Sequence, residues 1–178
     1  MRRGVRLGID VGDVRVGVAT CDPDGMLATP VATLTRTPGA ETAAGSGDAP
    51  SATDADIVEI AALAAESQAI EIVVGLPLLL SGEQGSAALK VRQYALVLAG
   101  ACRPVEVRLV DERLTSVDAH RGLRESGVAG KRQRAVVDQA AAVLILQTAL
   151  DLERSSGRAP GESVGGKRRK PRTKDRTG

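Results

Sequence analysis

Aromatic residues are nearly absent from this sequence of 178 residues, which has no Trp, no Phe and a single Tyr. The core must therefore be built from Val, Leu, Ile and Ala, which supply most of the 43% of residues that are apolar. The same scarcity argues against a protein that binds single strands by stacking bases on aromatic rings. A chain of this length fits one domain that can bury a core without disulfides or a structural metal.

Long apolar runs are missing too. No stretch approaches the roughly 20 apolar residues that span a bilayer, and none resembles the apolar part of a signal peptide. We therefore expect a cytoplasmic protein with no membrane partner. The sequence also lacks a GxxxxGK[ST] loop, which argues against a P-loop nucleotide hydrolase.

Cysteine and histidine are scarce. Cys21 and Cys102 lie far apart and form no CxxC pair, which favours reduced core thiols over a disulfide framework or a zinc site. An intermolecular or redox-linked disulfide remains an alternative. The single histidine, His120, cannot supply a His-based zinc site, and we expect it on an exposed helix surface.

Charge is distributed unevenly along the chain. The net charge is +2, but residues 167–176 hold seven basic residues against one acidic residue, a local charge of +6. Residues 1–166 then hold 17 basic and 21 acidic residues, a charge of −4. A mildly acidic body with a cationic tail predicts an anionic partner, nucleic acid first. The alternative is a solvated tail that only aids solubility.

Hydrophobic periodicity predicts an α/β fold in one domain over residues 1–156. A Gly12-Asp13 hairpin signal joins the first two strands. Later strands alternate with helices, which predicts parallel strands, so we expect a mixed five-stranded sheet in which an antiparallel meander is extended by parallel strands and flanked by helices. Residues 37–52 are predicted to be a flexible insertion and residues 157–178 a basic, disordered tail. The predicted strands are 5–11, 15–21, 26–34, 70–74 and 105–110, and the predicted helices are 53–67, 86–101, 116–125 and 132–154.

Three carboxylates are expected at one edge of this sheet. Asp10 ends the first strand, and the strand over 105–110 ends in Asp111 and Glu112. The two strands should be parallel with one strand between them, so both ends meet the same crevice, where sites form in open α/β sheets. Asp138 sits early in the last helix among Val and Ala. Together Asp10, Glu112 and Asp138 would suit Mg²⁺ or Mn²⁺, and two such ions can promote phosphodiester hydrolysis.

Each of these residues also has an ordinary interpretation. Asp10 could shape the hairpin turn, Glu112 could pair with Arg113, and Asp138 could favour the helix dipole. A basic cluster precedes Asp138 and could hold phosphates beside the metals, or could be a solvated helix face. Its members are Arg121, Arg124, Lys131, Arg132 and Arg134.

Four segments stand in a fixed order within residues 4–153: Leu7-Gly-Ile-Asp-Val-Gly, Val73-Val-Gly-Leu-Pro-Leu, Val110-Asp-Glu-Arg-Leu-Thr-Ser and Asp138-Gln-Ala-Ala-Ala-Val-Leu-Ile-Leu. In this order they resemble the YqgF family of the ribonuclease-H-like superfamily. The resemblance implies a ribonuclease-H-like fold and a divalent-metal-dependent nuclease. Two roles are implied, Holliday junction resolution and maturation of the 5′ end of pre-16S ribosomal RNA, the latter with ribosomal precursor particles as partners.

By motif position the family's acidic residues fall on Asp10, Glu112 and Asp138. Arg113 and Thr115 become expected substrate contacts, and Asp111 could share the metal with Glu112. One loop departs from the family, which usually carries polar residues after Pro77, because here Leu78-Leu79-Leu80 follows.

Several functions stay open on the sequence alone. Junction resolution requires two symmetric cuts and hence a homodimer, whereas trimming a precursor RNA could use a monomer. A non-catalytic binder of branched nucleic acid or of ribosome precursors is the main alternative to a nuclease. An actin-like phosphotransferase shares the Asp-x-Gly strand turn but needs two such domains, and this chain supplies one.

Overall fold

The structure, a computed structural model, describes residues 1–36, 49–114 and 131–165, and over residues 131–138 only the backbone. Every strand and helix predicted within these residues is present, with bounds that agree to within two residues. The predicted helix over 116–125 and His120 lie outside the described residues, as do 37–48 of the insertion and 166–178 of the tail. The elements are β1 (Arg6–Val11), β2 (Arg15–Cys21), β3 (Ala28–Thr35), α1 (Ala55–Glu66), β4 (Glu71–Leu76), α2 (Ser86–Ala101), β5 (Glu106–Asp111), η1 (Glu112–Leu114), α4 (Lys131–Ser156) and β6 (Glu162–Ser163).

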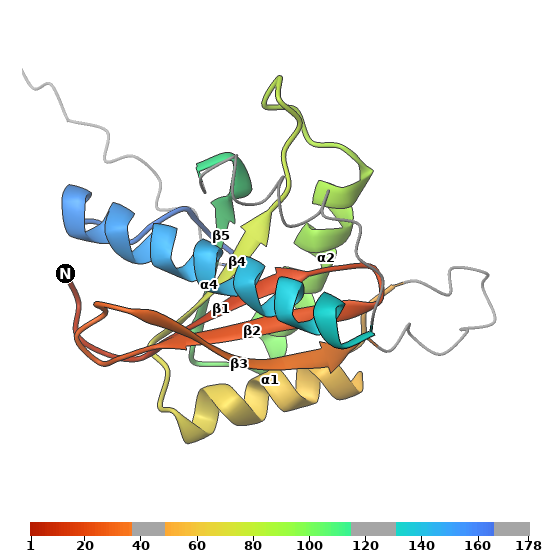
Figure 1. The fold of residues 1–178 in the computed structure, drawn as a ribbon, viewed down its shortest axis with the longest axis horizontal. Coiled ribbons are helices and arrows are strands. Elements are labelled where there is room, and N and C mark those ends of the chain that lie inside the picture. Colours follow the sequence, from red (N-terminus) through yellow and green to blue (C-terminus); the bar gives the residue numbers. More distant parts are fainter. Residues whose placement is uncertain (37–48, 115–130, 166–178) are drawn as a thin grey trace, which may run out of the picture.

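The strands form one mixed sheet in the order β3-β2-β1-β4-β5-β6 (Figure 1). β1, β2 and β3 are an antiparallel meander, and β4 and β5 run parallel to β1. The predicted meander and parallel half are therefore confirmed. Between Val11 and Val16 the hairpin closes with the Gly12 amide donating to the Arg15 carbonyl at 2.9 Å.

The sheet has six strands and not the five predicted, because residues 162–163 add to the far side of β5. These residues lie in the segment predicted to be a disordered tail. The Val164 amide donates to the Val107 carbonyl at 2.8 Å, and the Arg108 guanidinium donates to the carbonyls of Pro160 and Gly161. A two-residue strand has no periodicity to detect, so it depends on such contacts rather than on a local pattern.

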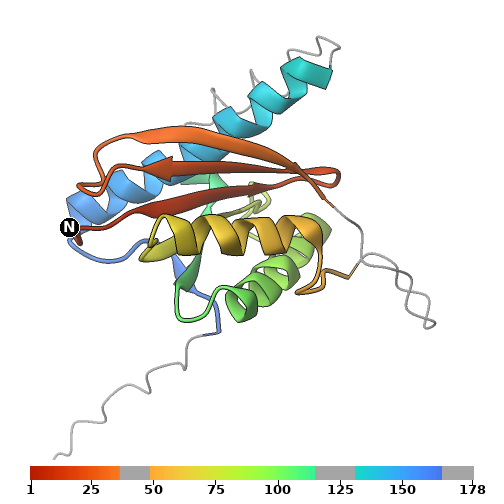
Figure 2. The same ribbon diagram turned by 90° about the horizontal axis from the view of Figure 1, so that it is seen from below.

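Helices cover both faces of the sheet, with α4 on one face and α1 and α2 on the other (Figure 2). Side chains alternate between the faces along each strand. Leu7 and Ile9 of β1 join the core with α1 and α2, whereas Val73 of β4 and Val110 of β5 pack against α4. The expected aliphatic core is confirmed, and the single tyrosine, Tyr94 of α2, is buried within it.

Both cysteines are buried and unbonded, as predicted. Burial raises the pKa of the Cys21 thiol, and it raises that of Cys102 to about 11, so both stay protonated at neutral pH. Among the described helices, none is long and apolar enough to cross a membrane.

Helix α4 lies close against β1 because position 8 is glycine. A Cβ there would lie 2.6 Å from the Leu146 Cβ and 2.8 Å from the Ala142 carbonyl oxygen, so any side chain would push the helix away. Further along the helix, Glu153 meets Arg6 at the start of β1. The helix therefore runs antiparallel to β1, and the turns before Ala142 extend toward the end of β1 that carries Asp10.

At the opposite end of this face lies a buried ionic network that the sequence did not predict. The side chains of Arg6 and Glu71 are 0% exposed and that of Glu153 is 2% exposed. Arg2 reaches both Glu71 and Glu153 at 2.9 Å, and Arg6 donates to Glu153 at 3.0 Å. Arg108 stands 3.9 Å from Glu71. The network ties the N-terminus, three strands and the last turns of α4 together.

The two carboxylates of the network have pKa values that shift in opposite directions. Burial alone would raise the pKa of Glu153, but hydrogen bonds from Arg2 and the charge of Arg6 outweigh it and hold the pKa at about 2. At Glu71 burial prevails over its arginine neighbours and raises the pKa. Glu153, which accepts four hydrogen bonds from Arg2 and Arg6 whereas Glu71 accepts one from Arg2, is the ionic centre of the network.

Candidate active site

The carboxylates of Asp10 and Glu112 come to the same place on the α4 face of the sheet. Asp10 is 7% exposed and follows Gly8 by two residues on β1, so it points to the α4 side. Ile9 of β1 pairs with Val74 of β4, and the next position in this register sets Gly75 beside Asp10. A Cβ at position 75 would lie 2.8 Å from the Glu112 Oε1, so the Glu112 carboxylate lies over this glycine. Because Gly75 has no side chain, the Glu112 carboxylate, which follows β5, can extend across β4 toward β1.

Asp111 takes a different direction from Glu112. It is paired in register with Leu76, which belongs to the core on the α1 and α2 side, and it follows Val110, which packs on α4. Strand alternation therefore directs Asp111 away from the α4 face. Its carboxylate is held by the Arg113 guanidinium, with Nη2 to Oδ2 at 2.6 Å and Nε to Oδ1 at 3.0 Å.

Arg113, a predicted substrate contact, is thus engaged within the protein. Its hydrogen bonds to Asp111 hold the pKa of that carboxyl below its usual value. Its Nη1 also faces the carbonyl oxygens of Leu79 and Leu80 at 3.4 and 3.5 Å. The predicted alternative in which Glu112 pairs with Arg113 does not match this geometry, because the ion pair forms with Asp111.

Asp138 lies on α4, and its side chain is outside the described residues. Position 138 precedes Ala142 by four residues and Ile145 by seven, so helical periodicity places it on the stripe that faces the sheet. Ala142 and Ile145 are fully buried against Gly8 and Gly75. The backbone therefore brings position 138 one turn beyond Gly8, toward the end of β1.

The remaining predicted site residues cannot be placed beside these carboxylates. Thr115, Arg121 and Arg124 lie outside the described residues, and Lys131, Arg132 and Arg134 are described only as backbone of α4. Within the side chains that the structure describes, no three acidic, His or Cys residues form a group that could hold a metal. Asp10 and Glu112 supply two of the three expected carboxylates.

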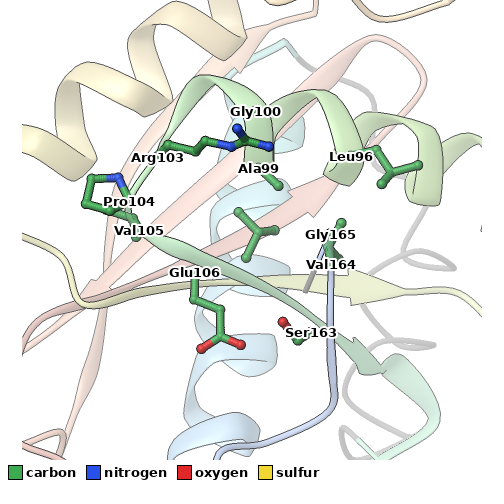
Figure 3. A pocket seen from close by; sticks show the side chains of 11 residues that line it. Leu96, Ala99, Gly100, Arg103, Pro104, Val105, Glu106, Ser163, Val164 and Gly165 are labelled. Atoms are coloured by element: carbon green, nitrogen blue, oxygen red, sulfur yellow. The ribbon is translucent and has the colours of Figure 1, made fainter. Parts of the chain in front are cut away.

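A pocket of about 360 Å³ lies elsewhere, between the end of α2, the start of β5 and the segment after β6 (Figure 3). Its lining includes Leu96, Arg103, Glu106 and Val164. This is the amino end of β5, whereas Glu112 follows its carboxyl end. The pocket is therefore separate from the carboxylates.

Comparison with known proteins identifies the family. Residues 4–152 match the model of the RuvX family, described as Holliday junction resolvase. This chain belongs to the RuvX family. RuvX is the YqgF family of the sequence analysis, so the predicted membership is confirmed. The match spans β1 to α4 and includes the three acidic positions that the motifs predicted.

Two relatives of this RuvX chain carry the same name. A protein of Streptomyces coelicolor named "Putative pre-16S rRNA nuclease" is 56% identical over 92% of this chain and 90% of its own length. One of Kineococcus radiotolerans with the same name is 52% identical over 100% of this chain and 88% of its own. The predicted nuclease activity is confirmed at the level of the family and of these relatives.

Solved structures show the same fold at low sequence identity. Thermus thermophilus RuvC in complex with a Holliday junction substrate is 17% identical, with a TM-score of 0.52 over 88% of this chain and 99% of RuvC. A second structure of Thermus thermophilus RuvC is 16% identical, with a TM-score of 0.51 over 88% of this chain and 98% of RuvC. The ribonuclease-H-like fold predicted for this RuvX chain is confirmed.

Sequence reasoning missed the feature that lets the site form, which is Gly75. In the sequence, Gly75 stands out only as part of the family motif that begins at Val73. The signal available was that a glycine interrupts an otherwise branched, buried strand, which marks a close approach by another group.

Proposed function

We propose that this RuvX nuclease cuts phosphodiester bonds at the sheet edge where Asp10 and Glu112 lie, with Asp10, Glu112 and Asp138 holding two Mg²⁺ or Mn²⁺ ions. The observation that carries the proposal is the Glu112 carboxylate over Gly75, on the same face as Asp10. Carboxylate oxygens are the donors that these hard cations prefer. The donor set therefore fits the metal.

The protein's own residues supply the frame for this chemistry. When bound, such ions would acidify an attacking water and neutralise charge on the leaving oxygen. Asp10 is fixed within a strand paired on both sides, and Gly75 keeps the space between it and Glu112 open. Asp138 is proposed to complete the set from α4, where Gly8 allows the helix to lie close. Thr115 and the basic residues Arg121, Arg124, Lys131, Arg132 and Arg134 are proposed to contact phosphates.

The proposed substrate is the 5′ end of precursor 16S ribosomal RNA, in bacterial cytoplasm and on precursor particles. The names of relatives that are 52% and 56% identical favour it. A four-way DNA junction is the second candidate, favoured by the description of the family model. Cutting a junction symmetrically would require a homodimer, so the oligomeric state should be measured together with cleavage.

The test compares the two neighbouring acidic residues at the end of β5. Glu112→Gln should lower cleavage at saturating substrate by on the order of a hundredfold or more, because it removes a metal ligand. Asp111→Asn should cost about tenfold or less, because Asp111 faces the other side of the sheet. Rates would be measured on the precursor RNA and on a synthetic junction with Mg²⁺, Mn²⁺ or EDTA.

Each outcome of this comparison separates one alternative from another. Equal losses for both variants would place the second ligand on both residues, and a larger loss for Asp111→Asn would place it on Asp111. Cleavage that persists in EDTA would contradict the metal site. Binding without cleavage under every metal would instead support the non-catalytic binder.

A second variant tests the open space above Gly75. Gly75→Ala sets a Cβ 2.8 Å from the Glu112 Oε1 and 2.5 Å from the Ile145 Cδ1, so both must move. We expect cleavage to fall about 10- to 100-fold and the free energy of unfolding to fall by about 1–3 kcal/mol. Adding Ile145→Val should recover stability but not cleavage, because the contact with Glu112 remains.

Gly100→Ala is the matched control for this variant. Position 100 lies in α2 with nothing within 4 Å of an added Cβ. It should keep full cleavage and gain helix stability. Full activity in Gly75→Ala would mean that the position of Glu112 is not critical.

A further inference from the structure

A buried polar cluster lies beside the β1–β2 hairpin and has no role in the site described so far. Tyr94 of α2 is 1% exposed, and its hydroxyl donates at 2.7 Å to the Asp56 Oδ2, in the first turn of α1. Burial and the Asp56 carboxylate raise the pKa of Tyr94, so the hydroxyl keeps its proton. The guanidinium of Arg36, the residue after β3, lies 5.6 Å from the centre of the Tyr94 ring. The cluster therefore joins α1, α2 and the end of β3.

Arg36 connects this cluster to the hairpin. Its Nη1 donates to the Gly12 carbonyl at 3.3 Å, and its amide donates to the Val14 carbonyl at 2.9 Å. The Gly12 amide in turn donates to the Arg15 carbonyl at 2.9 Å. Figure 2 shows the hairpin at the same end of the molecule as the first turn of α1. The side chain and the main chain of one residue thus hold the turn together.

The hairpin matters because it helps to set the position of Asp10. The pairing of β1 with β4 ends at Ile9, whereas the pairing of β1 with β2 continues through Asp10 and Val11. The last two residues of β1 therefore depend on β2 and on the turn that joins the two strands. Gly12, whose carbonyl accepts from Arg36, follows Asp10 by two residues, so a shift of the turn would also move Asp10.

A buried charge at this place carries a cost that an apolar side chain would avoid. Arg36 is 9% exposed, and taking a guanidinium out of water is unfavourable unless it is paired or hydrogen-bonded. The face of an aromatic ring attracts a cation, and the single aromatic ring of the chain provides that face. A leucine or methionine could fill the same space but could not donate to the Gly12 carbonyl. The guanidinium therefore adds a directed bond to the hairpin.

We propose that Arg36 is a positioning residue for the Asp10 carboxylate, on which it acts through the Gly12 carbonyl while the Tyr94 ring, fixed by Asp56, supports its guanidinium. The proposal rests on the metal-binding role proposed above for Asp10. Arg36 would contact neither metal nor substrate, because Tyr94 belongs to the core on the α1 and α2 side and Asp10 faces α4. A hairpin held in this way keeps Asp10 in place before the ion binds, which raises the affinity for the metal.

The experiment measures metal affinity and hairpin opening in the full chain without nucleic acid. Arg36→Met keeps most of the length of the side chain but removes its charge and its donors. The dissociation constant for Mn²⁺, measured by electron paramagnetic resonance of the free ion, should rise about tenfold. Hydrogen exchange of the Gly12 amide should be about tenfold faster, while the amides of β4 and β5 exchange as in wild type. Arg36→Lys keeps a cation over the ring and should lose less than about threefold in affinity.

Cleavage separates positioning from a direct part in the chemistry. Arg36→Met should need about tenfold more Mg²⁺ for half of its maximal rate, because Asp10 is held less firmly. At saturating Mg²⁺ and substrate the rate should return to within about threefold of wild type, because all three proposed metal ligands are present.

Lys90→Met is the matched control. The Lys90 Nζ, on α2, lies 3.5 Å from the Asp13 Oδ1 of the same hairpin, but the two side chains are 48% and 84% exposed. Water screens this contact, so the Mn²⁺ affinity and the exchange of the Gly12 amide should stay within about twofold of wild type.

Three results would contradict the role of Arg36, and they differ from one another. Unchanged Mn²⁺ affinity in Arg36→Met would overturn the positioning role alone. Faster exchange throughout β4 and β5 would also overturn it, because the variant would then have lost stability in general. Absence of Mn²⁺ binding in wild type would contradict the metal site itself, and the role of Arg36 together with it.

Discussion

Asp10→Asn is expected to abolish Mg²⁺-dependent cleavage while leaving the protein folded. The substitution keeps the shape of a side chain that is 7% exposed but removes the charge that would hold the metal. A loss on the order of a thousandfold or more, about 4 kcal/mol of barrier, is expected for the removal of a central ligand. Cleavage of precursor RNA and of a synthetic junction at saturating substrate would measure it.

Stability and binding provide the matching measurements for Asp10→Asn. Asparagine keeps the shape of the Asp10 side chain, so the Asn variant should remain folded, with a free energy of unfolding within about 1 kcal/mol of wild type. Nucleic-acid binding in EDTA should be unchanged. Asp13→Asn, three residues further along with a side chain that is 84% exposed, is the control and should cleave normally. Full activity in Asp10→Asn would remove Asp10 from the site.

Glu153→Gln should lower the free energy of unfolding by about 3–5 kcal/mol, because it leaves buried guanidinium charge without its carboxylate. Glu153 accepts from Arg2 at 2.9 Å and from Arg6 at 3.0 Å in a nearly dry setting. Urea unfolding followed by circular dichroism would measure the change. A loss below about 1 kcal/mol would mean that the network adds little.

A neighbouring acidic residue on the same helix serves as the control. Asp151 pairs with Arg154 at 2.9 Å, but its side chain is 55% exposed. Asp151→Asn should cost less than about 1 kcal/mol, because water screens an exposed pair. A larger loss for Glu153→Gln than for Asp151→Asn would show that burial, not the presence of an ion pair, determines the loss in free energy of unfolding.

Acidity should reduce the difference between wild type and Glu153→Gln. The pKa of Glu153 is held at about 2, below the ordinary value of 4.5, so its contribution to stability is complete above about pH 4.5. The contribution is lost as the pH falls from there toward 2, where the carboxyl protonates in the folded protein too. The two unfolding curves should therefore converge over that interval.

The sequence predicted the sheet because the connection between two strands determines their relative direction. A tight hairpin joins antiparallel strands, and a helical crossover joins parallel ones. Asp10 and Glu112 were predicted at one edge since the strands that they end are parallel with a single strand between them. Which of Asp111 and Glu112 faces the Asp10 side could not be predicted from the sequence, because it depends on how η1 turns the chain after β5. Gly75 leaves the space that the Glu112 carboxylate occupies.

Long-range charge pairing could not be predicted from the sequence. Arg6, Glu71 and Glu153 are far apart in the chain, and each resembles an ordinary surface charge at the end of an element. Their common burial follows only from α4 packing antiparallel to β1 and β4. In the same way, β6 depends on the hydrogen bonds from Arg108 to the carbonyls of Pro160 and Gly161. A strand of two residues is too short for a sequence pattern to predict it.

The pairing of Arg6 with Glu153 also bears on when the protein can fold. The two residues are separated by 147 positions, so β1 leaves the ribosome long before its partner is made. Until the last turns of α4 emerge, burying Arg6 would leave it without the carboxylate that accepts its hydrogen bond, with only Glu71 at 3.8 Å, and this is unfavourable. The first strands must therefore remain open or loosely packed during synthesis, and the sheet closes when nearly the whole domain is available. A nascent chain that stops before the end of α4 would not become a stable nuclease.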